Sequence, residues 1–211
     1  MTRHSSPELL VLHGVRLLGF ADTVEVAGRF ALDPADTART LAVAQERDWV
    51  QHTAFADLGG WSLTGDGRAE NERQLARERA VADPDDVIGS TYREFLPLNA
   101  RLLRACTEWQ LAPSGGATLA TNEHTDPDRD ARILDELAAL HRAMVPLVDR
   151  LTGVLARFTG YDSRFAAALR RAWHGEHDWV DRTHVDSCHR VWFQLHEDLM
   201  ATLGIDRGAE H

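Results

Sequence analysis

The sequence predicts a mainly α-helical protein with one small β-hairpin, divided into two regions near residue 82. Three observations support this prediction. Apolar residues recur at helical spacing through most of the chain, an extended stretch interrupted by a Gly-Gly pair lies between residues 49 and 63, and an Asp/Pro cluster at 83–86 separates short elements from long ones. The predicted domains are therefore residues 1–82 and 83–211, and the second is all helical.

Three helices are expected in the first domain. Ser6-Pro7-Glu8 combines a capping side chain, a proline at the first helical position and an acid that complements the helix dipole. A second start at Asp22-Thr23 leads to a short helix that ends near Phe30. After a turn at 31–34, a third helix is predicted from about Ala35 to Arg47, with Thr37, Leu41 and Ala44 as its inward face.

Extended structure follows the third helix. Residues 49–55 and 61–63 read as two strands, and Gly59-Gly60 supply the flexible tip of a hairpin. A charged helix then runs to about Ala82. Three helices, a hairpin and a further helix are typical of a winged helix-turn-helix.

The junction between hairpin and helix resembles a known signature. The segment Trp61-Ser62-Leu63-Thr64-Gly65-Asp66-Gly67-Arg68, with Leu75 eight residues after Gly67, resembles the "LTxxGR" motif that closes the wing in MarR-type and PadR-type bacterial transcriptional regulators. The resemblance covers about residues 6–82. It implies a third helix that enters the major groove and a wing, from Thr53 to Gly60, that touches the DNA backbone or the minor groove.

The resemblance also implies which residues contact DNA. Those expected at the groove, the wing and the phosphates are Asp36, Arg39, Thr40, Val43, Arg47, Thr53 and Arg68. Because few residues precede the first helix, the arrangement is closer to PadR, and dimerisation is expected from the C-terminal domain.

That C-terminal domain reads as long apolar-faced helices. One spans about residues 92–109 with Pro97 inside it, a second about Asp130–Phe158 with Pro146 inside it, and two more cover Asp162–Trp173 and about Asp178–Leu203, while residues 112–128 form an exposed loop. Two helices kinked by proline can leave a cavity between them. The candidate lining of a small-molecule effector pocket is Tyr92, Arg93, Asn99, Trp109, His141 and Trp192.

Composition limits the remaining classes of function. The 211 residues contain 23 basic residues, all of them Arg, against 33 acids, for a net charge of −10. This balance argues against broad binding to nucleic acid or to an anionic membrane, so any DNA contact must be local. No apolar stretch approaches the roughly 20 residues that cross a bilayer, and no secretory signal precedes the first helix, so a cytoplasmic protein is expected. Cys106 and Cys188 are expected as buried thiols.

Enzyme chemistry has little support in the sequence. Five of the 11 histidines lie between His174 and His196, but their spacing completes no metal-binding signature, so neither a metal nor another cofactor is predicted. No glycine spacing fits a phosphate loop and no serine sits in a nucleophile elbow. The protein is therefore expected not to be an enzyme.

The leading hypothesis is a homodimeric transcriptional regulator that binds a double-stranded DNA operator and responds to a small-molecule effector through its helical C-terminal domain. The alternative is a winged helix that serves protein contacts. It rests on the charge of residues 1–82, which hold 9 Arg against 12 Asp and Glu, and on a wing, residues 54–60, without a basic residue. A third hypothesis is a metal-dependent enzyme that uses the C-terminal His/Asp cluster.

Overall fold

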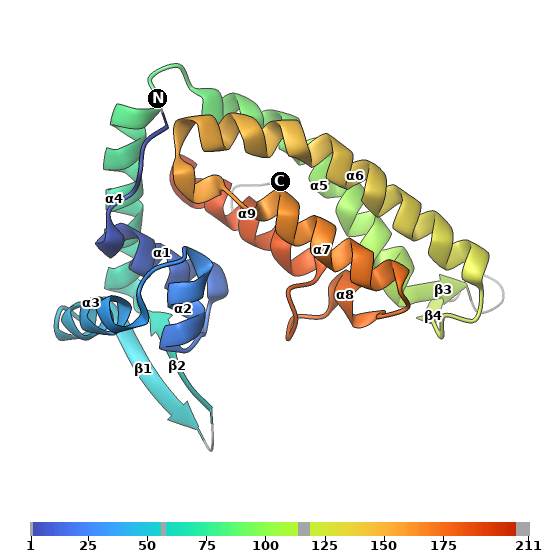
Figure 1. Cartoon of the computed structure of the whole chain (residues 1–211), viewed down its shortest axis with the longest axis horizontal. Helices are drawn as coiled ribbons and strands as arrows, with labels where there is room; N and C mark the ends of the chain where they lie inside the picture. The colour runs from blue at the N-terminus through green and yellow to red at the C-terminus, as the bar shows by residue number, and fades with distance from the viewer. Residues whose placement is uncertain (1, 56–57, 114–118, 206–211) are drawn as a thin grey trace. The chain divides into compact units, whose positions relative to one another are not determined.

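The computed structural model describes residues 2–55, 58–113 and 119–205. It is mainly helical, with a small antiparallel hairpin near the N-terminus, as the sequence predicts (Figure 1). The chain groups into two units. The first holds residues up to 86 together with 154–157 and the segment from 196 onward, and the second holds 87–153 and 158–195.

This division differs from a single boundary at residue 82. Two segments expected in the C-terminal domain belong to the first unit. One of them, residues 154–157, is held by the N-terminal strand-like segment, where Arg3 N–H donates to Val154 O at 3.0 Å and Ala156 N–H donates to Arg3 O at 2.9 Å. The other contributes Ala201, which packs in a small core with Leu9 and Leu75.

The first unit contains three short helices, a hairpin and a longer helix. These are α1 (Pro7–Leu18), α2 (Thr23–Arg29), α3 (Pro34–Glu46), β1 (Val50–Phe55), β2 (Leu58–Leu63) and α4 (Gly65–Ala82). The three predicted helix starts are confirmed. Ser6 Oγ accepts from Leu9 N–H at 3.3 Å, Asp22 forms a capping box with Glu25, and Asp33 caps α3.

The core of the first unit joins α1, α2, α3 and β1. Its buried residues are Val11, Leu12, Val15, Ala21, Val26, Leu41, Ala44 and Val50. The inward face predicted for the third helix is confirmed, because Thr37, Leu41 and Ala44 are all buried. Burial of one large aliphatic side chain contributes about 1.5–3 kcal/mol, so this cluster stabilises the small helices around it.

The predicted place of Gly59-Gly60 at the hairpin tip is wrong. Both glycines lie within β2, where Gly59 pairs with Ala54 and Gly60 with Thr53. Glycine is required at position 60 by the lack of space for a side chain and not by a turn conformation, because a Cβ on Gly60 would lie 2.6 Å from the ring of Phe20. The tip of the wing, residues 56–57, falls outside the described residues.

Gly67, in the predicted signature, has a similar steric role. A Cβ at this position would lie 1.7 Å from the carbonyl oxygen of Trp49, so the first turn of α4 can approach the start of β1 only with glycine there. Thr64 completes the junction, since its Oγ1 accepts from Gly67 N–H at 3.0 Å and its own N–H donates to Trp49 O at 3.1 Å. Thr64 and Gly67 thus fix how α4 leaves the hairpin.

The second unit is built on two long helices, and its elements are α5 (Val87–Gln110), β3 (Leu111–Pro113), β4 (Leu119–Thr121), α6 (Pro127–Val154), α7 (Tyr161–Trp173), α8 (Asp178–Asp181) and the first part of α9 (Cys188–Leu203). A 3-10 turn, Ala156–Phe158, follows α6. Pro97 and Pro146 each lie inside one uninterrupted helix.

Two expectations for this unit are corrected. The predicted loop at 112–128 contains the antiparallel pair β3–β4, in which Leu111 faces Thr121. The predicted helix from Asp178 to Leu203 is broken between α8 and α9, because Arg182 adopts an extended backbone and Ser187 Oγ then accepts from Arg190 N–H at 3.1 Å to start the next helix. Across the described part of the chain, the helices include none long and apolar enough to cross a membrane.

Candidate nucleic-acid interface

The outward face of α3 is the surface that the resemblance to MarR-type and PadR-type regulators would place at the major groove. Because α3 packs on α1 and α2 through its buried residues, the opposite side of the helix is left to solvent. Arg39 has 72% of its side chain exposed, and Val43 is 43% exposed. Asp36 is exposed as well, and Thr40 is half-buried.

The polar groups of this face already have partners within the chain. Arg39 forms an ion pair with Asp36, one turn earlier, and Thr40 Oγ1 donates to Asp36 O at 3.0 Å. Arg47 Nη1 lies 3.8 Å from Glu8 Oε2, and its guanidinium sits 4.7 Å from the ring centre of Trp49. Exposed ion pairs of this kind contribute about 0–1 kcal/mol, so a phosphate or a base edge can replace the carboxylate at little cost.

The hairpin is fixed to the helices at its base and presents exposed side chains along β1. The indole N–H of Trp61 donates to Thr23 Oγ1 at 3.1 Å, and Ala21 exchanges backbone hydrogen bonds with Trp61. His52 packs edge-on against Trp61 with 4.8 Å between ring centres. Thr53, the residue predicted at the wing, is exposed.

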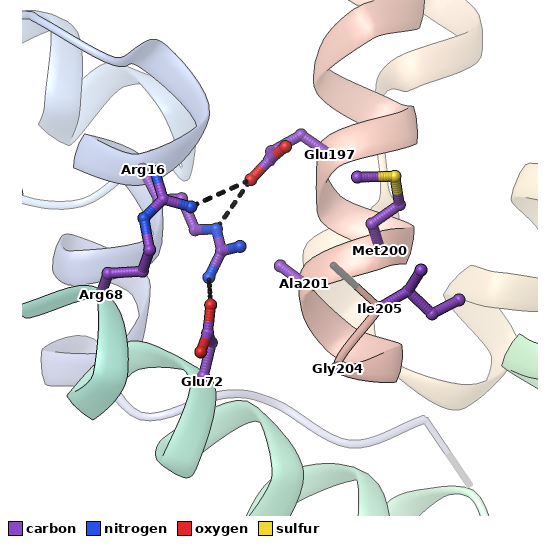
Figure 2. A pocket seen from close by; sticks show the side chains of 8 residues that line it. All are labelled: Arg16, Arg68, Glu72, Glu197, Met200, Ala201, Gly204 and Ile205. Atoms are coloured by element: carbon purple, nitrogen blue, oxygen red, sulfur yellow. Dashed lines mark hydrogen bonds and ion pairs between the residues drawn. The ribbon is translucent and has the colours of Figure 1, made fainter. Parts of the chain in front are cut away.

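Arg68 lies apart from α3, beside a charged cavity. This cavity of about 400 Å³ is lined by α1, α4 and the end of α9, all within the first unit (Figure 2). Arg68 Nη1 is 3.9 Å from Glu197 Oε1, which also accepts from Arg16 Nε at 2.8 Å. Arg16 in turn donates to Glu72 Oε1 at 3.0 Å. With 57% of its side chain exposed, Arg68 still reaches solvent.

A buried ion network holds the end of α9 in the first unit. Arg157 and Asp198, both fully buried side chains, form an ion pair, and Arg157 also donates to Glu78 Oε2 at 3.1 Å and to Thr202 Oγ1 at 2.7 Å. His13 Nε2 lies 3.0 Å from Asp198 Oδ1. These groups come from segments far apart in the sequence, and no local pattern could have predicted that they meet.

Burial and charge set the protonation of this network. Burial lowers the pKa of His13, and the nearby Asp198 carboxylate offsets this only in part, so His13 is neutral at pH 7. Burial alone would raise the pKa of Asp198, but the guanidinium of Arg157 and the hydrogen bond with His13 outweigh it and hold that pKa well below its usual range. Asp198 is therefore a fully buried carboxylate that stays charged.

The residues predicted to line an effector pocket divide into different environments. Trp192 is buried, its indole N–H donates to Asn99 Oδ1 at 3.0 Å, and its ring stacks on Phe95 with 4.9 Å between centres. His141 stacks on Phe165, which meets Trp192 edge-on at 5.9 Å. Asn99, His141 and Trp192 thus belong to one packed aromatic core.

The other three predicted residues lie elsewhere in the second unit. Trp109 is buried and packs against His124 and His177, with ring centres 4.4 and 5.5 Å away. Tyr92 is buried on α5, and Arg93 is exposed on the same helix. Within the ranges that the structure describes, three or more His, Cys, Asp or Glu side chains nowhere gather as metal ligands.

Comparison with known proteins gives no match: no family model fits the chain, and neither the curated proteins nor the solved structures show significant similarity to it.

Proposed function

We propose that the protein is a DNA-binding transcriptional regulator in which α2 and α3 act as a helix-turn-helix and the β1–β2 hairpin as a wing. The observation that carries the proposal is the uncovered outer face of α3. Beside Arg39 and Val43, this face exposes small side chains at Ala35, Ala38 and Ala42, together with the acids Asp36 and Glu46. Small side chains let a helix approach the floor of the major groove, where the long side chains beside them can reach base edges.

The chemistry of this face fits direct reading of bases. Arg39 can donate two hydrogen bonds to the O6 and N7 atoms of guanine, and Val43 offers an apolar contact for a thymine methyl group. Arg47, at the end of the helix, and Thr53, on the hairpin, are placed in this proposal at the phosphate backbone. The proposal includes a homodimer, because two such helices one DNA turn apart read a two-fold symmetric operator.

The acidic first domain sets the salt dependence of this binding. With Arg39, Arg47 and Arg68 as the candidate phosphate or base contacts, the slope of log affinity against log salt should be no steeper than about −3 per protomer. A broadly basic DNA-binding domain would show a much steeper slope. A shallow slope with a clear sequence preference is therefore the expected signature.

The test is a fluorescence-anisotropy titration of the full chain with duplexes from its own upstream region, against an unrelated duplex of the same length, from 50 mM salt upward. Arg39→Ala should weaken binding to the preferred duplex by roughly 5- to 150-fold, the equivalent of about 1–3 kcal/mol for one bidentate contact. Arg182→Ala is the matched control, since Arg182 has a similarly exposed pair, with Asp178, in the second unit. Equal affinities for both duplexes, or equal losses in both variants, would refute the proposal.

A second candidate function is a winged helix that binds another protein. It is favoured by two large apolar side chains on the surface of the first unit, Phe20 at 50% and Val24 at 67% exposure. In that case Val24→Asp would abolish capture of a partner, while Arg39→Ala would leave it intact. The absence of any DNA complex at 50 mM salt, together with this pattern, would favour the second candidate.

A further inference from the structure

Helices α5 and α6 of the second unit lie side by side and run in opposite directions (Figure 1). Two contacts fix their register. Arg101 donates through Nε and Nη2 to the carboxylate of Glu136 at 2.8 and 3.0 Å, and Arg129 Nη2 donates to the backbone carbonyl of Glu108 at 2.8 Å. A cavity of about 290 Å³ is lined by these four residues and by others on the same two helices.

The two helices carry the same charged pattern at this cavity. On α5 it is Arg101, Arg104 and Glu108, and on α6 it is Arg129, Arg132 and Glu136, so both follow the spacing Arg-x-x-Arg-x-x-x-Glu. Residues at i, i+3 and i+7 share one face of a helix. Because the helices are antiparallel, the first Arg of each copy meets the Glu of the other copy, through its side chain in one case and its backbone in the other.

The middle arginine of each copy is the unusual member. Arg104 and Arg132 are exposed, line the cavity, and form no hydrogen bond or ion pair with any residue that the structure describes. In the register set above, Arg104 lies at the level of Ile133 and Arg132 at the level of Ala105. Ala105 and Ile133 are both buried and form the apolar floor of the cavity.

The electrostatics of the cavity favour an anion. Four guanidinium groups and two carboxylates line it, which leaves two positive charges in a chain whose net charge is −10. Arg101, with a smaller contribution from Arg104, lowers the pKa of Glu136, so this carboxylate stays ionised and neutralises one arginine. The Nε of Arg129 is also buried without a hydrogen-bond partner among the described residues. Several N–H donors are thus available without breaking an existing contact.

We propose that this cavity, which we call the arginine cavity, binds a small anion that carries a diphosphate group. A guanidinium matches the spacing of two phosphate oxygens, so Arg104 and Arg132 can each hold one phosphoryl group. A ligand with at least two negative charges balances the two uncompensated positive charges. The volume of about 290 Å³ lies just below the roughly 300–1,000 Å³ found for ligand sites, which suits a diphosphate better than a large organic molecule. The proposal does not depend on DNA binding.

The test is isothermal titration calorimetry of the full chain with inorganic pyrophosphate at pH 7.5 and constant ionic strength, with orthophosphate and succinate as comparison ligands. Pyrophosphate should bind at one saturable site per chain, at least tenfold more tightly than either comparison ligand. Arg104→Gln and Arg132→Gln should each weaken binding about tenfold or more, and the double variant should abolish it. Arg142→Gln is the matched control, since Arg142 is exposed on α6 but does not line the cavity.

A variant that improves binding separates the proposal from effects of misfolding. Glu108→Gln removes a carboxylate from the cavity wall and should tighten pyrophosphate binding several-fold. The proposal is overturned if no saturable binding occurs, if Arg142→Gln weakens binding as much as Arg104→Gln does, or if succinate binds as tightly as pyrophosphate. Circular dichroism of each variant shows whether its fold is retained.

Discussion

Replacement of Asp198 by Asn tests the buried ion network of the first unit. The side chain of Asp198 is fully buried and faces three partners, Arg157, His13 and Thr202, whose Oγ1 lies 3.3 Å from Asp198 Oδ1. Asn keeps the shape of Asp but loses the charge, and it offers one acceptor oxygen in place of two. The guanidinium of Arg157 would then remain buried with less compensation.

The size of the effect follows from what Arg157 keeps. Loss of one partner of a buried pair typically destabilises a protein by about 3–5 kcal/mol, because the remaining charge stays out of water. Arg157 retains its contact with Glu78 Oε2 at 3.1 Å, so the lower end of this range, about 3 kcal/mol, is expected. Such a loss is a large fraction of the 5–15 kcal/mol by which folded proteins are usually stable.

The assay is urea unfolding followed by far-ultraviolet circular dichroism, which reports on a mainly helical chain. Asp178→Asn is the control, since its pair with Arg182 is exposed and its loss should change the free energy of unfolding by no more than about 0.5 kcal/mol. If Asp198→Asn costs less than about 1 kcal/mol, Asp198 is not the charged centre of the network and the reasoning fails.

Three further predictions concern protonation, packing and thiols. The pKa of His13 is lower in the folded protein than the value of about 6.5 in an unfolded chain, so the unfolded state binds a proton more readily. The contribution of His13 to stability is therefore present above pH 6.5, and the free energy of unfolding should fall as the pH drops toward 5, by at most about 1.4 kcal/mol per pH unit. The urea midpoints of the His13→Gln variant should not show this dependence on pH. Gly67→Ala should destabilise the protein by about 1–3 kcal/mol in the same urea assay. Gly65→Ala is the control and should be neutral or slightly stabilising, because a Cβ at position 65 meets nothing within 4 Å. Equal effects of the two substitutions would contradict the steric role of Gly67. Burial raises the pKa of Cys106 to about 12 and raises that of Cys188 further, so both thiols should react with a disulfide reagent only after denaturation, and rapid reaction of the native protein would contradict this.

Helix starts in the first unit were predictable because their chemistry is local. Ser6, Asp22 and Asp33 each accept hydrogen bonds from backbone N–H groups two or three residues later, so a short window of sequence contains the whole interaction. The hairpin tip was mispredicted because neither Gly59 nor Gly60 has a positive φ angle, and Gly60 is required instead by a residue outside the hairpin, the ring of Phe20. Steric demands made by distant residues leave no local trace.

The two charged sites differ in how visible they are from sequence. The buried network depends on His13, Arg157 and Asp198, which are separated by more than a hundred residues in two of their three pairings and show no shared spacing. The arginine cavity, in contrast, is lined by two segments with the same Arg-x-x-Arg-x-x-x-Glu pattern, at residues 101–108 and 129–136. A comparison of charge spacing along residues 101–136 would have found it, whereas the search for aromatic pocket residues led to the packed core around Trp192.

The arginines of this chain differ in how readily an anion can bind them, because each must release a different carboxylate partner, or none. Arg157 is not available to an anion, because its displacement would leave the buried carboxylate of Asp198 without its cationic partner. Arg68 can leave Glu197 at low cost, because Arg16 continues to neutralise that carboxylate at 2.8 Å. Arg39 has only an exposed carboxylate to release.

Arg104 and Arg132 have no such partner to release among the described residues, so a small multivalent anion should engage them before it competes at α3. Pyrophosphate at concentrations that saturate the arginine cavity should therefore leave the proposed contact of Arg39 with DNA largely intact. Any change in DNA affinity under those conditions should vanish in the Arg104→Gln/Arg132→Gln double variant. If the double variant responds as the natural chain does, the anion competes directly at the proposed DNA-binding face of α3, and the order of availability derived from the ion pairs is wrong.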